Sequence, residues 1–127
     1  MEHVKYTDLV LDYKMNKGQF GEEIAKNYLI KNGYRIIERN FRTKFGEIDI
    51  IAEKGDYIIF IEVKFRKNPE FGNAEEAINL HKLKKIENTA NFYLKNFYKK
   101  NKNPRIDVIA INCFDKIEIN HYKNVSF

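Results

Sequence analysis

The chain has 127 residues but a single cysteine, Cys113, so it can form neither an internal disulfide nor a cysteine-rich zinc site. This usage is typical of the reducing cytoplasm, where we expect the protein to reside with an inert thiol. Long apolar runs are also missing, since the longest, such as YIIFI at residues 57–61, are far shorter than the roughly 20 residues that cross a bilayer. The N-terminus has scattered charges and no apolar stretch with a cleavage site, so we expect no secretory signal and no membrane partner.

Signatures of several enzyme classes are missing as well. The six glycines form neither a GxGxxG pattern nor a Walker loop, which disfavours nucleotide-driven enzymes. The sequence has no GxSxG elbow and no Cys–His nucleophile pair, which disfavours covalent hydrolases. The histidines, His3, His81 and His121, are too dispersed for a metal site, and we expect each at the surface.

Acidic residues are missing from one segment of a basic chain. The formal net charge is +5, which permits a polyanionic partner without demonstrating one. No acidic residue lies between Glu87 and Asp107. Five basic residues fall there, interleaved with aromatic ones: Lys95, Lys99, Lys100, Lys102 and Arg105. Such a run is typical of a solvated helix end and loop, and nucleic-acid binding is the alternative.

Hydrophobic periodicity predicts one domain over residues 1–127, with an N-terminal extension at 1–15 and a core at 16–127. A helix is predicted from about Gly18 to Asn32, where the Asn32-Gly33 pair supplies a stop. Alternating apolar patterns predict strands at residues 34–42, 46–54, 57–64, 105–112 and 116–123.

A second helix is clearest from Asn79 to about Tyr98, and Asn73 and Asn79 are alternative N-caps for it. The resulting order is helix, three strands, helix, and then one or two strands. It predicts an α+β fold, in which a mixed central sheet is flanked by helices.

The segment GEIDIIAEKGDYIIFIEVK at residues 46–64 is predicted to form a hairpin that turns at Gly55-Asp56. In this register Asp49 faces Glu62 and Glu47 faces Lys64. These four side chains would project from one face, together with Ile51 and Phe60. The other face is predicted to be core: Ile48, Ile50, Ala52, Ile59, Ile61 and Val63.

Directly opposed carboxylates are unfavourable in a sheet. At a separation of about 5 Å they repel by about 0.8 kcal/mol in water and about 3 kcal/mol at an effective dielectric near 20. One interpretation is a solvated strand face on which Lys64 supplies a cross-strand ion pair. The other is that Asp49 and Glu62 share a divalent cation, with Lys64 orienting an attacking water.

Asp49, followed after a twelve-residue gap by Glu62-Val63-Lys64 and preceded by a helical Glu22, resembles the signature of the PD-(D/E)xK nuclease superfamily. Ile48 stands in place of the superfamily's proline. From about Gly18 to Ile111 the chain also resembles the YraN-like bacterial family, in stretches such as GEEIAKNYLIKNGYRIIERNFRTKFGEIDIIA, IIFIEVKFR, HKLKKIENTANFYL and PRIDVIAI. The resemblance implies a restriction-endonuclease-like αβββαβ core, related to that of archaeal Holliday-junction resolvases.

The resemblance also implies roles for individual residues. The implied catalytic residues are Glu22, Asp49, Glu62 and Lys64. The implied ligands of Mg²⁺ or Mn²⁺ are Asp49, Glu62, the Val63 carbonyl and Glu22. Glu47 is either a partner of Lys64 or an outer group of the site. Basic residues expected to hold the phosphate backbone are Arg39, Arg42, Lys44 and Lys82.

Two functions follow from these expectations. The first is a metal-dependent endonuclease that hydrolyses phosphodiester bonds in DNA, including branched or structured DNA. The alternative is a catalytically inactive accessory protein that binds nucleic acid and keeps the nuclease fold. The presence of all four expected residue types favours the enzyme. The preferred substrate, the cleavage position and a homodimeric state are left open.

Overall fold

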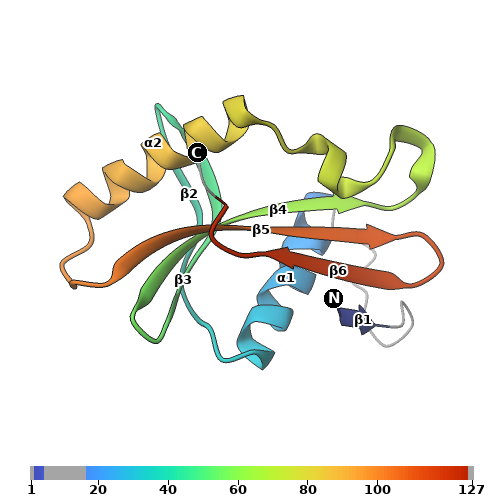
Figure 1. Cartoon of the computed structure of the whole chain (residues 1–127), viewed down its shortest axis with the longest axis horizontal. Coiled ribbons are helices and arrows are strands. Elements are labelled where there is room, and N and C mark those ends of the chain that lie inside the picture. Colours follow the sequence, from blue (N-terminus) through green and yellow to red (C-terminus); the bar gives the residue numbers. More distant parts are fainter. Residues whose placement is uncertain (1, 5–16, 126–127) are drawn as a thin grey trace.

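The computed structural model describes residues 2–4 and 17–125, which form one mixed sheet with helices on both faces (Figure 1). The strands are β1 (Glu2–Val4), β2 (Arg35–Thr43), β3 (Gly46–Lys54), β4 (Tyr57–Arg66), β5 (Asn103–Cys113) and β6 (Ile117–Tyr122). The helices are α1 (Lys17–Lys31) and α2 (Leu80–Asn96), with 3₁₀ turns η2 (Pro69–Phe71) and η3 (Ala74–Ala77) between β4 and α2.

The strand order is β1-β6-β5-β4-β3-β2, with β4 and β5 parallel and the other neighbours antiparallel. From α1 to β5 the α-helices and strands follow the order αβββαβ, and β6 comes after them, so the predicted α+β fold with a restriction-endonuclease-like core is confirmed. Strand β1, which pairs with β6, was not predicted. None of the helices in the described segments is long and apolar enough to span a membrane.

An asparagine side chain caps the N-terminus of η3, and another caps the N-terminus of α2. The Asn79 side chain accepts from the Lys82 N–H at 2.9 Å and caps α2. The Asn73 side chain accepts from the Glu76 N–H at 3.2 Å and caps η3 instead. Both predicted caps are therefore used, and each begins its own element.

The hairpin register is confirmed near the turn and ends earlier than predicted. Gly55 has a positive φ of 57°, and the ladder runs from Lys54↔Tyr57 to Ile50↔Ile61. It stops there, so the predicted pairs Asp49–Glu62 and Glu47–Lys64 are not formed as backbone partners. β3 stays paired with β2 to Gly46, and β4 stays paired with β5 to Arg66. The two strands part because each follows its other neighbour.

Both faces of the hairpin are buried, which corrects the prediction of a single core face. The cluster beneath α1 contains, from the three central strands, Ile50, Ala52, Ile59, Ile61, Ile109 and Ile111. The cluster beneath α2 contains Ile48, Ile51, Ile58, Phe60, Ile106 and Val108. Ile48, which was predicted to share a face with Ile50, belongs to the second group instead. A sheet covered by helices on both faces needs apolar residues at both parities of its central strands.

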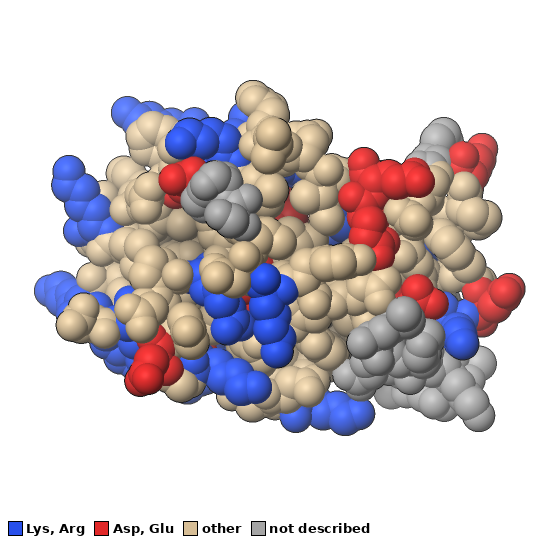
Figure 2. Space-filling view, viewed as in Figure 1, with Lys and Arg blue, Asp and Glu red and all other residues tan. Residues whose placement is uncertain are grey.

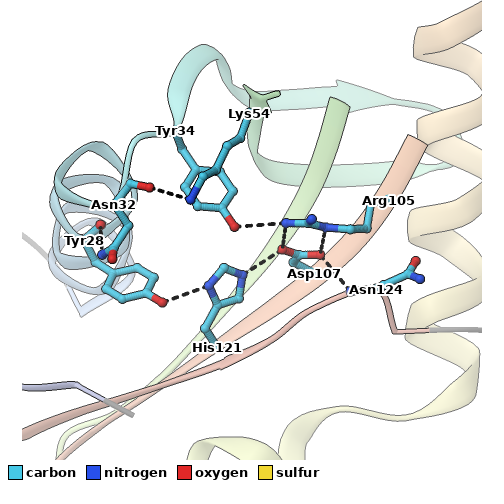
Figure 3. A network of polar contacts seen from close by, with 8 residues as sticks. All are labelled: Tyr28, Asn32, Tyr34, Lys54, Arg105, Asp107, His121 and Asn124. Carbon is cyan, nitrogen blue, oxygen red and sulfur yellow. Dashed lines mark hydrogen bonds and ion pairs between the residues drawn. The ribbon is translucent and has the colours of Figure 1, made fainter. Parts of the chain in front are cut away.

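A buried ion network joins β5 to β6 and α1 (Figure 3). The Asp107 carboxylate is fully buried, accepts two 2.9 Å hydrogen bonds from Arg105, and lies 2.7 Å from His121 Nε2. The Tyr28 hydroxyl lies 2.9 Å from His121 Nδ1. The prediction of a structural Asp107 is supported, but the predicted surface position of His121 is wrong. Its side chain is 5% exposed, because α1 covers this part of β6.

A second ion cluster explains much of the basic segment. Glu53 is buried and accepts hydrogen bonds from Tyr98, Lys100 and Arg35. Lys102 donates to the Gly55 carbonyl. The segment before β5 is thereby tied to the β3–β4 turn. In Figure 2, Lys and Arg predominate on the left, over the C-terminal part of α2, and Asp and Glu gather on the right.

Cys113 is buried, and this burial raises the pKa of its thiol to about 11. The expectation of a buried or inert thiol is confirmed as regards burial, and a thiol that stays protonated at neutral pH is a poor nucleophile.

Candidate active site

A cavity of about 460 Å³ opens where β3 and β4 part. Four elements line it: α1 supplies Gly18 and Glu22, the two strands supply the acidic centre, and the first turns of α2 close one side. The lining residues are Gly18, Glu22, Gly46, Glu47, Asp49, Glu62, Val63, Lys64, Phe65, Arg66, Lys82, Lys85 and Ile86. The structure therefore brings together all four residues expected to be catalytic.

Asp49 joins the two strands at the point where their ladder ends. Its carboxylate accepts a 2.8 Å hydrogen bond from the backbone N–H of Val63. This bond satisfies a partly buried amide that has lost its strand partner, and it orients the carboxylate toward the cavity. Asp49 therefore bonds to the backbone of β4, and its carboxylate also interacts with that of Glu62.

Glu62 is the most buried acid of the cavity, with 8% exposure. Burial raises the pKa of Glu62 well above its ordinary value, and the hydrogen bond and charge of Asp49 raise it further. Burial and the neighbouring Asp49 therefore both disfavour ionisation of Glu62, as expected for a carboxyl group in a partly desolvated site beside a like charge. A cation bound between the two carboxylates would offset the repulsion between their negative charges.

Two lysines approach the acid pair from different elements. Burial lowers the pKa of the Lys64 ammonium, and the nearby Lys82 lowers it further, whereas the charges of Glu62 and Asp49 act in the opposite direction. Lys82 is held in the first turn of α2, directly after the Asn79 cap. The two lysines are suited to bind an anionic ligand, and the two carboxylates beside them are suited to bind a metal ion.

Glu47 does not pair with Lys64 as one of the alternatives proposed. Its carboxylate lies 3.1 Å from Arg42 Nε at the rim of the cavity. Glu22 reaches the same cavity from α1, at the edge of the buried helix face, as predicted. Burial raises the pKa of Glu22, and the charge of Asp49 adds to this effect.

Asn40 is a residue of the site that sequence reasoning missed. It lies within β2 with a φ of 54°, in the left-handed region that few residues other than glycine adopt. With its amide nitrogen turned toward the neighbouring acceptors, it donates to Glu22 at 2.9 Å and to Glu47 at 3.3 Å. The signal in the sequence was an asparagine, a residue depleted in strands, between apolar and basic strand residues.

Of the basic residues expected to contact phosphate, only Lys82 lines the cavity. Arg39 lies 3.3 Å from Glu23 of α1 and is half-buried. Arg42 is exposed beside Glu47 at the rim, and Lys44 is exposed in the β2–β3 turn. Lys82 lines the cavity, as does Lys85, which lies one turn further along α2 and was not singled out from the sequence.

The donor atoms of the cavity are oxygens of carboxylates and of the backbone. Within residues 2–4 and 17–125, no three Asp, Glu, His or Cys side chains come together in an arrangement that would hold a metal. Two carboxylates and the Val63 carbonyl nevertheless offer only oxygen donors, which suits Mg²⁺ or Mn²⁺ with water completing the shell. The residues present therefore fit a hydrated hard cation better than a closed, all-protein metal site.

The chain is similar to proteins of one family over most of its length. Residues 21–111 match the model of a family described as "Uncharacterised protein family UPF0102". A UPF0102 protein of Thermodesulfovibrio yellowstonii is 46% identical over 114 residues, covering 90% of this chain and 98% of that protein. A UPF0102 protein of Clostridioides difficile is 46% identical over 108 residues, covering 85% and 94%, respectively. One of Clostridium kluyveri is 53% identical over 96 residues, covering 74% and 77%. The predicted YraN-like kinship is confirmed.

Proposed function

We propose that this chain, which belongs to the UPF0102 protein family, is a metal-dependent endonuclease that hydrolyses phosphodiester bonds in DNA. The observation that carries the proposal is the acid pair of buried Glu62 and partly buried Asp49, with Lys64 beside it, in a cavity between diverging strands. Desolvated like charges reduce stability, and such groups concentrate at functional sites.

In this proposal Asp49 and Glu62 hold Mg²⁺ or Mn²⁺, with the Val63 carbonyl as a further oxygen ligand and Glu22 approaching from α1. A divalent cation bound there would supply a hydroxide-like water near neutral pH and polarise the phosphoryl oxygen. The hydrogen bond from Val63 keeps the Asp49 carboxylate in place before substrate binds.

The other residues position the phosphodiester. Lys64 lies beside the acid pair, where its ammonium would orient the water and stabilise charge developing on the phosphoryl group. Lys82 and Lys85 would bind the adjoining phosphates from α2, and Arg42 and Lys44 would do so from the rim. Arg39 would act mainly through its ion pair with Glu23.

Several finer points belong to the same proposal. Glu47 would serve as an outer group that holds Arg42 and Asn40 at the site.

The cytoplasm is the proposed compartment, in keeping with the buried lone thiol of Cys113. Branched or otherwise structured DNA is the proposed substrate, and a homodimer would present two such cavities.

The test is cleavage of a panel of labelled DNAs, comprising single-stranded, flapped, duplex and four-way-junction forms, in Mn²⁺, Mg²⁺ or EDTA. We expect metal-dependent cleavage that falls more than about 100-fold in Asp49→Asn, since even residues that only orient a metal ligand contribute about 10- to 100-fold. Asp115→Asn, an exposed aspartate near the β5–β6 turn, is the matched control and should cleave normally.

The second candidate function is binding of nucleic acid without catalysis. It is favoured by the lack of three clustered metal-binding side chains within the described residues. A folded wild-type protein that binds the panel in a salt-dependent manner, cleaves no member of it, and binds equally well as Asp49→Asn would establish this function and exclude the nuclease.

A further inference from the structure

Three phenylalanine rings form a partly exposed aromatic platform next to the cavity: Phe45 in the β2–β3 turn, Phe92 near the C-terminal end of α2, and Phe97, the C-cap of that helix. The rings of Phe45 and Phe92 are 5.8 Å apart, and those of Phe92 and Phe97 are 6.1 Å apart. Phe45 is 40% exposed and Phe97 is 59% exposed. Phe97 also contacts Phe41 at 5.7 Å, which anchors the platform to the core beneath α2.

The aromatic platform is continuous with the cavity. Gly46, the residue after Phe45, lines the cavity and packs against α2 so closely that an added Cβ would lie 3.2 Å from Thr89 Oγ1 and 3.7 Å from Lys85 Cβ. Lys85 lines the cavity too, and Phe92 follows it by seven residues. Seven helical residues rise by about 10 Å, which corresponds to about three nucleotide steps of a stacked strand.

Positive charge surrounds these rings. The Lys44 ammonium lies 5.4 Å from the centre of the Phe45 ring. Lys95 is exposed three residues beyond Phe92, on the neighbouring part of the α2 surface. Lys85 connects this charge to the cavity. Exposed aromatic rings interleaved with lysines are the combination that binds bases by stacking and the backbone by charge.

We propose that the aromatic platform binds unpaired bases of a DNA substrate by stacking and thereby leads the adjoining backbone into the acidic cavity. This inference rests on the proposed nuclease function and makes it more specific. In a duplex the base faces are already stacked, so rings at the surface have no free face to contact. The substrate class is therefore DNA with a single-stranded segment beside the scissile phosphate, such as a flap or an open branch.

A second copy of this chain is the alternative occupant, and size and charge disfavour it. A stable interface buries about 800 Å² on each partner, whereas a whole phenylalanine contributes only about 150 to 250 Å². Phe45 and Phe97 are each partly covered already, so the platform is too small by itself. Two copies meeting here would also bring Lys44 and Lys95 of each toward those of the other.

The chain has no tryptophan, so Phe45→Trp introduces a single fluorescent reporter into the platform. We expect its emission to be quenched when oligothymidylate is added in EDTA, and to recover at high salt. Phe114→Trp is the matched control, because Phe114 is 42% exposed near the β5–β6 turn. Binding of the oligonucleotide, followed by anisotropy, without a change in the Phe45→Trp emission would overturn the proposal.

Truncation provides the second measurement. Phe45→Ala and Phe97→Ala should weaken single-strand binding in EDTA by about 5- to 100-fold and change duplex binding by less than about twofold, whereas Phe114→Ala should change neither. Equal losses on both DNAs, absence of single-strand binding by the wild type, or a smaller oligomer in Phe45→Ala would each refute it. The readout does not involve cleavage, so failure of the nuclease assay alone would leave these results interpretable.

Discussion

Asp49 accepts a hydrogen bond from the Val63 N–H at the point where the β3–β4 ladder has ended. The bond links the two strands and holds one carboxylate of the candidate site at the opening of the cavity. Substitutions at Asp49 can therefore separate the structural role of the side chain from the role of its charge.

Asp49→Ala should be less stable than Asp49→Asn by about 1 to 2 kcal/mol. Both variants lose the charge, but the asparagine oxygen still accepts from Val63, whereas alanine leaves that N–H unpaired. The free energy of unfolding in urea, measured in EDTA, checks this. Equal stability of the two variants would show that water replaces the bond.

Glu62→Gln should stabilise the metal-free protein at pH 8 by about 1 kcal/mol. The pKa of Glu62 is raised in the folded state, so the wild type loses stability as the pH rises from 4.5 through the raised value, and glutamine removes this loss. Thermal unfolding in EDTA at pH 5 and pH 8 measures the effect, with the exposed Glu70→Gln as control.

Addition of Mn²⁺ or Mg²⁺ should raise the melting temperature of the wild type at pH 8 and should have little effect on Glu62→Gln. A metal ion that binds only the folded protein raises its free energy of unfolding, and the increase grows with the logarithm of the ratio of metal concentration to Kd. Equal shifts for both proteins would place the metal elsewhere.

Asn40→Gly and Asn40→Ala should differ in stability but not in activity. Both lose the amide that donates to Glu22 and Glu47, so cleavage should fall about 10-fold in each, the lower end of what residues orienting metal ligands contribute. Glycine tolerates the φ of 54°, whereas alanine there should cost about 1 kcal/mol more. Urea unfolding and cleavage rates, measured on the same preparations, separate the two effects.

Glu53→Gln should destabilise the protein at neutral pH and lose this effect in acid. Burial alone would raise the pKa of Glu53, but hydrogen bonds from Tyr98, Lys100 and Arg35 lower it to about 2. The charged form therefore contributes stability above the unfolded value of 4.5, and this contribution disappears as the pH falls toward 2. Because Arg35 and Lys100 are exposed, we expect about 1 kcal/mol, measured by urea unfolding at pH 6 and pH 3.

Lys82→Gln should weaken DNA binding similarly for all DNA forms and reduce the slope of log K against log salt by about 1. Its ammonium lines the cavity beside Lys64, where a phosphate would lie in the proposed complex. Lys116→Gln, an exposed lysine of the β5–β6 turn, serves as the control. An unchanged slope would place the DNA backbone elsewhere.

The sequence predicted the elements because they depend on local properties. Periodic apolar residues located α1, α2 and five strands, and Gly55 located the hairpin turn and hence its register up to Ile50↔Ile61. Resemblance to the nuclease signature pointed to Glu22, Asp49, Glu62 and Lys64, which the structure brings to one cavity.

Other features could not be read from local pattern. His121 was expected at the surface, since nothing near it in sequence reveals that Asp107 and Tyr28 contact its ring. Asn40 was missed because its role depends on its left-handed backbone and on two acids from other elements.

The sequence alone therefore determined the order of helices and strands, the family, and the identity of the acidic residues, because each follows from neighbours along the chain. Only the tertiary structure decided that the part of β3 before Ile50 is not paired with β4, since that depends on β2 holding one strand and β5 the other. The same parting of strands creates the cavity, and the docking of α2 against Gly46 brings Lys85 to it and Phe92 beside Phe45. Such contacts join residues far apart in the chain, and only the packing of helices on the sheet sets their distance.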